Sequence, residues 1–395
     1  MNAEPRPALA SGARRTIGER RRSRWIAAAA LGLISSTFST IVSQLLAARI
    51  GRDAAVDWMT VAAIPARDWA IGSEPSWNAM LAGIAFHQWA DFSWTLVFFG
   101  VLGRWTADLR PTTILLLALP WAVFSSGMEW FVLVPLFPFW QPLFTLQQPY
   151  WIGLLVHGSS AVMYPLFARL RWKRGTAPAS DVRFTTMWMT GALTVIAMLG
   201  AVALFGGHGY ELPWMGRDRD QDQAYIRHMT AHHAQGIELA RTAAERAQDP
   251  HLRKLAMLMV ASQTGENQIF EDWWLSWFDT EMPDCSTEER AAMPGFLTPA
   301  EMRQVKTAPP NQFDTLFVEA MSRHHRGAVR MANQMWHSRG DPRLRIMAHA
   351  IRHEQQGEIA LMHGTNGVAA VTTGVRNMLS DNVNRARGTL DRRAD

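Results

Sequence analysis

The sequence predicts an all-α protein, in which a bundle of about five transmembrane helices precedes a four-helix bundle made of two repeated helical hairpins. Two observations lead to this prediction. Long apolar runs rich in Trp, Phe and Leu occupy the chain up to about residue 207, whereas the chain from residue 211 on is polar, charged and rich in His and Met. Such a change of composition marks a boundary between a membrane part and a soluble part. The polar part also repeats itself at a fixed offset, with helix-start signals at matching places.

The apolar part contains five candidate spans. Each is close to the ~20 residues that an α-helix needs to cross about 30 Å of hydrocarbon. The third span is the least regular, because Pro120 and Glu129 interrupt it. Five such runs in succession favour a membrane domain over the buried helices of a soluble protein. The spans are residues 25–47, 79–101, 113–135, 149–168 and 184–206.

Basic residues orient these spans. Seven arginines precede the first span, and Arg or Lys also occur between spans two and three and between spans four and five. The connection between spans three and four has no charged residue. Because basic loops stay in the cytoplasm, we expect a cytoplasmic N-terminus and five crossings of a bacterial inner membrane, with the chain after residue 207 in the periplasm. A cleaved signal peptide is the alternative for the first span, and its removal would leave the orientation of the other four unchanged.

Composition also excludes several classes of site. Cys285 is the only cysteine, so an intrachain disulfide and a Cys-based zinc or iron–sulfur site are excluded. The high isoelectric point comes largely from arginines beside the spans, so it indicates topology rather than nucleic-acid binding. No P-loop, zincin motif or catalytic triad indicates an enzyme. The expected parts are a cytoplasmic basic tail at residues 1–24, a helical membrane domain at 25–207, a periplasmic domain at 211–363 and a disordered polar tail at 364–395.

Four ionisable residues fall inside the spans, where charged groups are costly and usually face the interior of a bundle. At a rise of about 1.5 Å per residue, His87, Glu129 and His157 share one layer in the outer half of the membrane, and Asp91 lies one turn deeper on the His87 face. One interpretation is a metal or proton site that opens toward the periplasm. The other, which we favour, is a set of hydrogen bonds that fix the helices against one another.

The polar part contains a duplicated unit. Two histidine pairs, His232–His233 and His324–His325, lie 92 positions apart, and a methionine precedes each pair by three residues. The same offset relates "DPHLRKLA" to "DPRLRIMA". Several matches at one period indicate a duplication. The other matched positions are Met229 with Met321, Gln263 with Gln355, and Glu266 with Glu358.

Each copy is expected to form a helical hairpin. Asp249 and Asp341 can cap the second helix of their hairpins, and a proline follows each of them at the first helical position. Two antiparallel hairpins give a four-helix bundle. The expected helices are residues 219–247, 250–277, 311–338 and 342–363, with 279–310 as a long, partly helical crossover.

The spacing of His, Met, Gln and Glu indicates a metal site. Residues three or four apart share a helix face, so each methionine can stand beside the histidine pair that follows it. Imidazole with thioether suits Cu(I) and accommodates Cu(II), whereas imidazole with carboxylate would also take zinc or iron. A di-iron bundle would prefer Glu-x-x-His pairs, and none lies at the duplicated positions. The expected ligands are His232, His233, His324, His325, Met229, Met321 and Met362, supported by Gln263, Glu266, Gln355 and Glu358.

Two simpler interpretations stay open for these residues. The histidines could bind nothing, but recurrence of the pair in both copies makes this less favourable than for a single pair. The methionines, taken alone, are more typical of core packing than of ligation.

The polar part resembles a known family. "MxxHH", "DPxLRxLA", "QxxEI" and above all "FDTLFVEAMSRHHRGAVRMA" are similar to the bacterial HH-repeat proteins of the domain-of-unknown-function family 305, over roughly residues 218–363. The resemblance implies a ferritin-like four-helix bundle that is secreted or periplasmic and binds copper in connection with copper tolerance. It also implies that the two histidine pairs, their preceding methionines and the Gln–Glu pairs are the family's functional residues.

The sequence departs from the family pattern mainly in the first copy. Phe270 stands where the second copy has Met362, and Phe296 replaces the second methionine of the family's "MPGM". Thr230 and Ala231 stand where the family usually has Ile-Pro. We therefore expect the second copy to be the better site for a soft metal.

Together these features predict an inner-membrane protein whose periplasmic domain binds copper and buffers, sequesters or delivers it. Its partners would be a metal ion and the lipid bilayer, without nucleic acid. The polar layer inside the spans could receive or deliver the ion. The alternatives are a membrane-anchored interaction or sensory module that binds no metal, and a metal transporter or metal-dependent enzyme that uses the membrane half.

Overall fold

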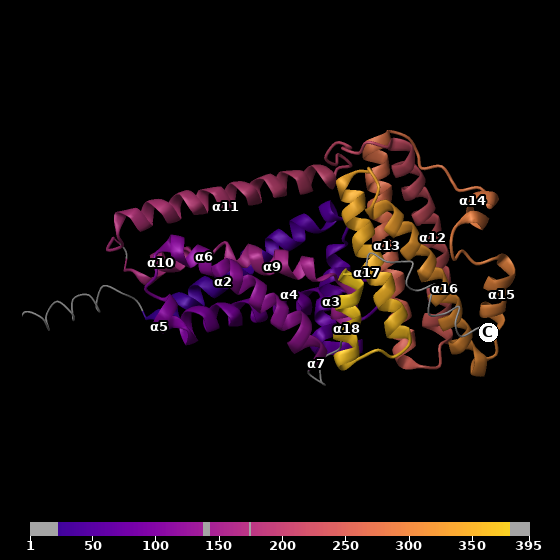
Figure 1. The fold of residues 1–395 in the computed structure, drawn as a ribbon, viewed down its shortest axis with the longest axis horizontal. Coiled ribbons are helices and arrows are strands. Elements are labelled where there is room, and N and C mark those ends of the chain that lie inside the picture. The colour runs from indigo at the N-terminus through magenta and orange to yellow at the C-terminus, as the bar shows by residue number, and fades with distance from the viewer. Residues whose placement is uncertain (1–22, 137–142, 174, 380–395) are drawn as a thin grey trace, which may run out of the picture. The chain divides into compact units, whose positions relative to one another are not determined.

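The computed structural model describes residues 23–136, 143–173 and 175–379 of the chain (Figure 1). Over these residues it is helical and contains no strand, which confirms the predicted fold class. The chain forms two compact units, each assembled from separate stretches. Among the described residues, the first unit comprises 23–42, 87–125, 154–173 and 175–198, and the second comprises 43–86, 126–136, 143–153 and 199–379.

The first unit is built from parts of long apolar helices. Its core is aromatic: Phe99 and Phe167 stack with ring centroids 3.9 Å apart, and Tyr164 packs 5.3 Å from Phe99. The helices that contribute to it are α2 (Arg24–Leu46), α4 (Trp77–Leu96), α5 (Gly103–Thr106), α6 (Pro111–Met128), α9 (Tyr150–Ala161), α10 (Leu166–Arg171) and α11 (Ala179–Gly206).

Four helices within the described residues are long and apolar enough to cross a membrane. They are Arg24–Ile50, Pro111–Leu136, Tyr150–Arg171 and Ala179–Gly206. The remaining expected span, residues 79–101, is helical in α4 and in the π-helical turn Val97–Val101, but it is not among these four. Its polar residues, which include His87, Gln88 and Asp91, make it less apolar than the others. The basic tail expected at residues 1–24 lies almost wholly outside the described residues.

The second unit contains the two predicted hairpins (Figure 1). The Asp249 carboxylate accepts from the backbone N–H of His251 at 2.9 Å, and the Asp341 carboxylate accepts from that of Arg343 at 2.9 Å. These caps begin the second helix of each hairpin where the sequence predicts, and the first helices also lie within two residues of the expected bounds. The four helices are α12 (Arg219–Arg246), α13 (Pro250–Phe278), α16 (Pro310–Trp336) and α17 (Pro342–Met362).

The crossover between the hairpins is partly helical, as expected. It contains α14 (Thr287–Ala292) and α15 (Pro299–Thr307), each of which begins with a capping box. In such a box the first residue's hydroxyl and a glutamate three positions later satisfy each other's backbone N–H groups. The capping box of α15 therefore fixes the end of the loop at residues 293–297 that leads into this helix.

Segments from the apolar half of the sequence also belong to the second unit. They are α3 (Ala54–Ala66) and α8 (Leu143–Gln147), which form helices between expected spans, and α7 (Val134–Leu136), at the end of the third expected span. Asp53 caps α3, because its carboxylate accepts from the N–H of Ala55 at 2.7 Å and of Val56 at 3.2 Å. Apolar residues of α3 and α8 are buried in the same core as those of α13 and α16.

Two glycines of the bundle make room for these segments. A Cβ atom at Gly265 of α13 would lie 2.6 Å from the Asp53 carboxylate, and one at Gly357 of α17 would lie 1.9 Å from the Leu146 carbonyl oxygen. Real Cβ atoms do not approach other atoms so closely. Gly265 and Gly357 occupy equivalent positions of the duplicated unit, so each copy accepts one segment.

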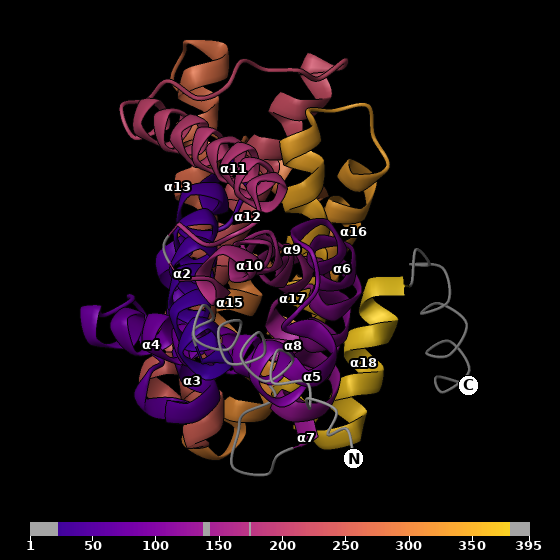
Figure 2. The same ribbon diagram turned by 90° about the vertical axis from the view of Figure 1, so that its left-hand side faces the viewer.

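The polar tail contains a helix, which corrects the expectation of disorder from residue 364 on. Residues Gly367–Leu379 form α18, which packs on α17, α8 and α7 (Figure 2). Its buried positions, Ala370, Gly374 and Asn377, follow one another at helical spacing. Small residues at these positions let the helix approach closely without a strong apolar signal in the sequence. The expected loose tail at 380–395 lies outside the described residues.

Candidate metal centre

The two histidine pairs come together inside the bundle. His232 of α12 and His324 of α16 stack with ring centroids 3.8 Å apart and planes 19° from parallel. All four imidazoles, including those of His233 and His325, are at most 1% exposed. Gly236 permits this approach, because a Cβ atom there would lie 3.0 Å from Nε2 of His324. The duplication read from the sequence thus corresponds to one buried histidine cluster.

The second histidine of each pair contacts the glutamate of the same copy that the sequence predicts as its supporting residue. Nε2 of His233 lies 2.8 Å from Oε2 of Glu266, and Nε2 of His325 lies 2.7 Å from Oε2 of Glu358. Both contacts are buried, and their angles fall outside the range of a good hydrogen bond. The same arrangement therefore occurs in both copies.

Several imidazole nitrogens in the cluster lack a hydrogen-bond partner. They include Nδ1 of His232, His233 and His325 and both ring nitrogens of His324, although the backbone of Gly295 acts electrostatically on His324. A buried polar atom without a partner costs about 1–3 kcal/mol. Several ring nitrogens without hydrogen-bond partners lie together in this cluster. Such a cluster fits a site in which these nitrogens bind a metal cation.

The crossover loop covers the stacked rings. Nε2 of His232 lies 3.1 Å from the Pro294 carbonyl oxygen, in position to donate to it. The Gln235 side chain exchanges two hydrogen bonds with the backbone of Leu297, at 2.7 and 2.9 Å, and so clamps the loop to α12. The ring of Phe296, which replaces a methionine of the family pattern, lies 6.1 Å from that of His232.

Burial sets the protonation of the cluster. It lowers the pKa of His232 and of His325 to about 3, and it lowers the pKa of His324 well below its usual value. Burial also raises the pKa of Glu358 to about 8, against the hydrogen bond from Gln147. These three imidazoles are thus neutral at physiological pH, which is the state in which a nitrogen lone pair can bind a metal.

The predicted methionine ligands occupy three different surroundings. Met229 is fully buried in an apolar cluster with Phe270 and several tryptophans. Met321 is fully buried in a second cluster, with Phe313. Met362 is partly buried at the end of α17 and lines a surface cavity of about 390 Å³ with His251. Apolar packing accounts for the first two positions.

The glutamines lie inside the bundle. Gln263 and Gln355 are 1% and 2% exposed, and Oε1 of Gln263 would lie 2.4 Å from a Cβ atom at Gly236. Within the described part of the chain, no three His, Cys, Asp or Glu side chains are already arranged to hold a metal ion. Binding at the histidine cluster would therefore require the side chains to rotate.

Comparison with known proteins identifies the family of the polar part of the chain. Residues 222–365 match the family described as "Domain of unknown function (DUF305)". They also match the "DUF305 fragment from Deinococcus radiodurans" at 33% identity, over 36% of this chain and 93% of that one, with a TM-score of 0.34.

The chain belongs to the DUF305 family. The predicted resemblance is thereby confirmed for the polar part of the sequence. The domain is also similar to the "putative secreted protein DUF305 from Streptomyces coelicolor", at 27% identity over 36% of this chain and 89% of that one, with a TM-score of 0.33. It is similar to "CopM in the Cu(I)-bound form", at 28% identity over 36% and 93%, with a TM-score of 0.31. None of the curated proteins matches the chain.

Residues outside the DUF305 domain contact the buried glutamates Glu354 and Glu358 of α17. The sequence did not predict these contacts. Arg52 donates to Glu354 at 2.8 Å and to Asp57 at 2.7 Å. Gln147 donates to Glu358 at 3.1 Å. The only local sign was the spacing of Glu354 and Glu358, which puts two buried carboxylates on one face of α17.

The ionisable residues of the spans are hydrogen-bonded to hydroxyl groups. In the first unit, the Ser39 hydroxyl donates to Asp91 at 2.7 Å and lies 3.0 Å from Nε2 of His87, and the Ser160 hydroxyl donates to Asp91 at 2.6 Å. His157 lies 2.9 Å from the Ser125 hydroxyl. These bonds join different helices, as the interpretation favoured from the sequence expects. Glu129 belongs to the second unit, where it begins the π-helical turn Glu129–Leu133.

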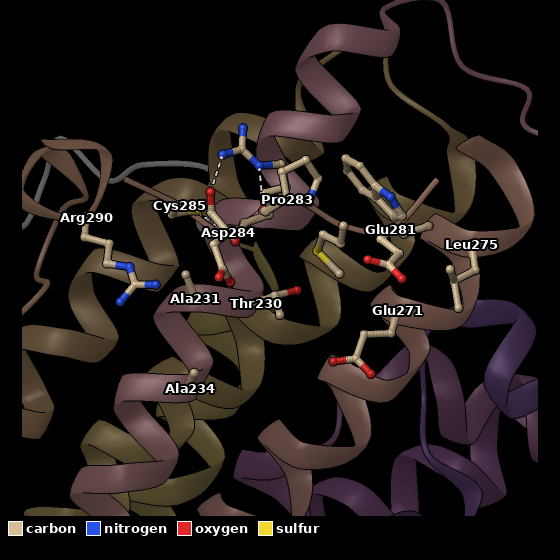
Figure 3. A pocket seen from close by; sticks show the side chains of 13 residues that line it. Thr230, Ala231, Ala234, Glu271, Leu275, Glu281, Pro283, Asp284, Cys285 and Arg290 are labelled. Carbon is tan, nitrogen blue, oxygen red and sulfur yellow. Dashed lines mark hydrogen bonds between the residues drawn. The ribbon is translucent and has the colours of Figure 1, made fainter. Parts of the chain in front are cut away.

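The DUF305 domain also has a surface cavity of about 390 Å³ beside α12 (Figure 3). Arg227 holds one of its walls, because it donates to the carbonyl oxygens of Pro283 and Asp284, both at 3.1 Å. Burial raises the pKa of the Cys285 thiol at the edge of the cavity. Carboxylates and guanidinium groups line the cavity together, so its charge selects no single class of ligand.

Proposed function

We propose that this chain is a membrane-anchored copper-binding protein, whose DUF305 domain holds the ion at the histidine cluster between α12 and α16. Its role would be to buffer, sequester or deliver copper outside the cytoplasm. The observation that carries the proposal is the stacked pair His232–His324, flanked in both copies by a buried His–Glu contact.

The donor atoms favour copper over other metals. The cluster offers neutral imidazoles and two carboxylates, and for such nitrogen and oxygen donors the affinity of divalent metals peaks at Cu²⁺. Zinc and iron are the competitors that this donor set would also accept. The choice of copper rests on these donor atoms and not on the likeness to the CopM structures.

The distribution of buried charge supports a cation site. Glu354 and Glu358 are buried near the cluster, as is Glu266, and Arg52 is the cation that pairs with this group. Burial raises the pKa of both Glu354 and Glu358 to about 8. At neutral pH these two carboxyls therefore hold their protons, and a bound metal ion would displace the protons and stabilise the charged carboxylates.

Contacts in the second unit support the predicted topology. The segment after the first span reaches the DUF305 domain through Arg52–Glu354, and the segment after the third span reaches it through Gln147–Glu358. These contacts fit an arrangement in which all three parts lie on the same side of the membrane. With α4 as a further crossing, five crossings would put the DUF305 domain opposite the arginine-rich N-terminus. The arrangement agrees with the distribution of basic residues.

Copper titration of the purified full-length protein tests the proposal. A variant with His232, His233, His324 and His325 all changed to Ala is expected to lose more than about 100-fold in copper affinity, since even outer partners of metal ligands are worth 10–100-fold. A control variant with the exposed His251 and His337 changed to Ala is expected to bind as the wild type does.

Equal copper affinity of the wild type and the quadruple variant would overturn the proposal. The bundle would then fit a module that recognises a protein partner without metal.

A further inference from the structure

We propose that Gln147, which lies outside the DUF305 domain, is a positioning residue for the metal centre: it holds Glu358 against His325, so that the second His–Glu pair is oriented in advance and the first is not. The proposal rests on the proposed copper-binding function. It adds a contribution of the membrane half to a site that the family domain was expected to form alone.

The two oxygens of Glu358 have different neighbours. Oε1 accepts a hydrogen bond from Nε2 of Gln147 at 3.1 Å, and Oε2 lies 2.7 Å from Nε2 of His325. The side chains of all three residues are buried. Because the carboxylate is anchored on one oxygen, the other stays in contact with the imidazole.

The backbone of α8 places Gln147 in this position. Gly357 lets the Leu146 carbonyl oxygen approach α17 so closely that a Cβ atom there would lie 1.9 Å away. The Thr145 carbonyl oxygen lies 3.4 Å from Nε2 of His353, one turn earlier on α17. Contacts at successive turns fix the register of α8 along the helix, so the amide group of Gln147 has little freedom to leave Glu358.

Among the residues that the structure describes, the first copy shows no such donor. Oε1 of Glu266 lacks a hydrogen-bond partner. The residue that fills the space at the equivalent glycine, Gly265, is Asp53. A carboxylate can only accept when ionised, so Asp53 cannot orient Glu266 as the Gln147 amide orients Glu358. The two copies therefore differ at the metal centre by one hydrogen bond from the membrane half.

An oriented glutamate has a chemical consequence for its histidine. A small rotation of the His325 ring, such as metal binding at the cluster requires, would let Nε2–H donate to Oε2 of Glu358 and would leave the lone pair on Nδ1. Nδ1 of His325 is buried and has no hydrogen-bond partner, so it is the atom that a metal ion would bind. A carboxylate partner of this kind also raises the basicity of the ligand. The second copy is thus prepared for an ion by a residue that lies 211 positions before Glu358 in the sequence.

A double-mutant cycle on the full-length protein in detergent tests the inference, with copper as the probe. Gln147→Leu is expected to weaken copper binding about 10-fold, the lower end of the loss seen for outer partners of metal ligands. The same change should weaken binding as much in a His233→Ala background, and not at all in a His325→Ala background. Gln147→Glu, which keeps the size of the side chain but removes its N–H groups, provides a second variant should Gln147→Leu fold poorly.

Gln148→Leu is the matched control. Gln148 is also a buried glutamine of this segment, but it donates to Asp57 at 2.8 Å. The inference is overturned if Gln147→Leu binds copper as the wild type does, if the loss persists in the His325→Ala background, or if Gln148→Leu shows the same loss. If the wild type itself binds no copper, the proposed function fails instead.

Discussion

His232 and His324 lie face to face across the interface of α12 and α16, with their ring centroids 3.8 Å apart. They occupy equivalent positions of the duplicated unit, so the two copies contact each other through the same residue. Buried imidazoles that leave ring nitrogens without a hydrogen-bond partner, Nδ1 in His232 and both nitrogens in His324, are unfavourable in a finished core. We therefore regard this contact as the centre of the protein's function rather than as a feature of its packing.

The loop residue Phe296 is predicted to limit the preference for Cu(I). Phe296→Met would put a thioether close to His232 in place of a ring whose centroid lies 6.1 Å from that of the histidine. Because thioethers select Cu(I), we expect the affinity for Cu(I) to rise by about tenfold and that for Zn²⁺ to stay the same. Competition titration with both metals measures this. Phe296→Leu is the control, since it removes the ring without adding sulfur.

Equivalent glycines of the two copies are predicted to tolerate alanine differently. A Cβ atom at Gly357 meets a backbone carbonyl oxygen, that of Leu146, whereas one at Gly265 meets the side chain of Asp53, which can rotate. We expect Gly357→Ala to lower the thermal unfolding temperature markedly, in line with the ~1–3 kcal/mol cost of overpacking. Gly265→Ala should have the smaller effect, and the reverse order would contradict the described docking of α8.

The stability of the metal-free protein is predicted to fall on acidification. Burial lowers the pKa of His232, His325 and His353 to about 3, whereas the unfolded chain titrates near pH 6.5. Between these values the unfolded state binds more protons at these histidines, so their contribution to the free energy of unfolding decreases as pH falls from about 6.5 toward 3. Denaturant unfolding at several pH values measures this slope. The quadruple His→Ala variant described above should show a shallower slope, and an unchanged slope would refute the assignment.

The topology can be tested by labelling single cysteines in intact cells. In a Cys285→Ser background, we expect Gln248→Cys to react with a thiol reagent that does not cross the membrane. Gln248 lies in the turn between α12 and α13. Thr176→Cys, between the last two spans, should not react. Both positions are exposed. The opposite pattern, or labelling of both, would rule out five crossings with a cytoplasmic N-terminus.

The parts of the fold that the sequence predicted depend on local signals. Asp249 and Asp341 are each followed by proline, and each begins a helix. Their carboxylates accept hydrogen bonds from backbone N–H groups only two residues later in the chain. The histidine pairs were recognisable because they recur at one offset. Both kinds of information are contained in a short window or in a repeat, so neither requires knowledge of tertiary structure.

The parts that were missed depend on contacts between distant segments. Nothing near Gln147 shows that it meets Glu358, and nothing near Arg52 shows that it meets Glu354. The methionines illustrate a related limit. Met229 shares a helix face with the histidines that follow it, but that face is wide enough for the methionine to point into the aromatic core.

The central claim is that the histidine cluster binds copper directly. Pulsed electron paramagnetic resonance of the Cu(II)-loaded full-length protein tests it, because the remote nitrogen of a coordinated imidazole modulates the signal. The account predicts imidazole modulation in the wild type and its loss or reduction when His232 and His324 are changed to Ala. Copper bound with the same spectrum in the wild type and in the quadruple His→Ala variant would contradict the account.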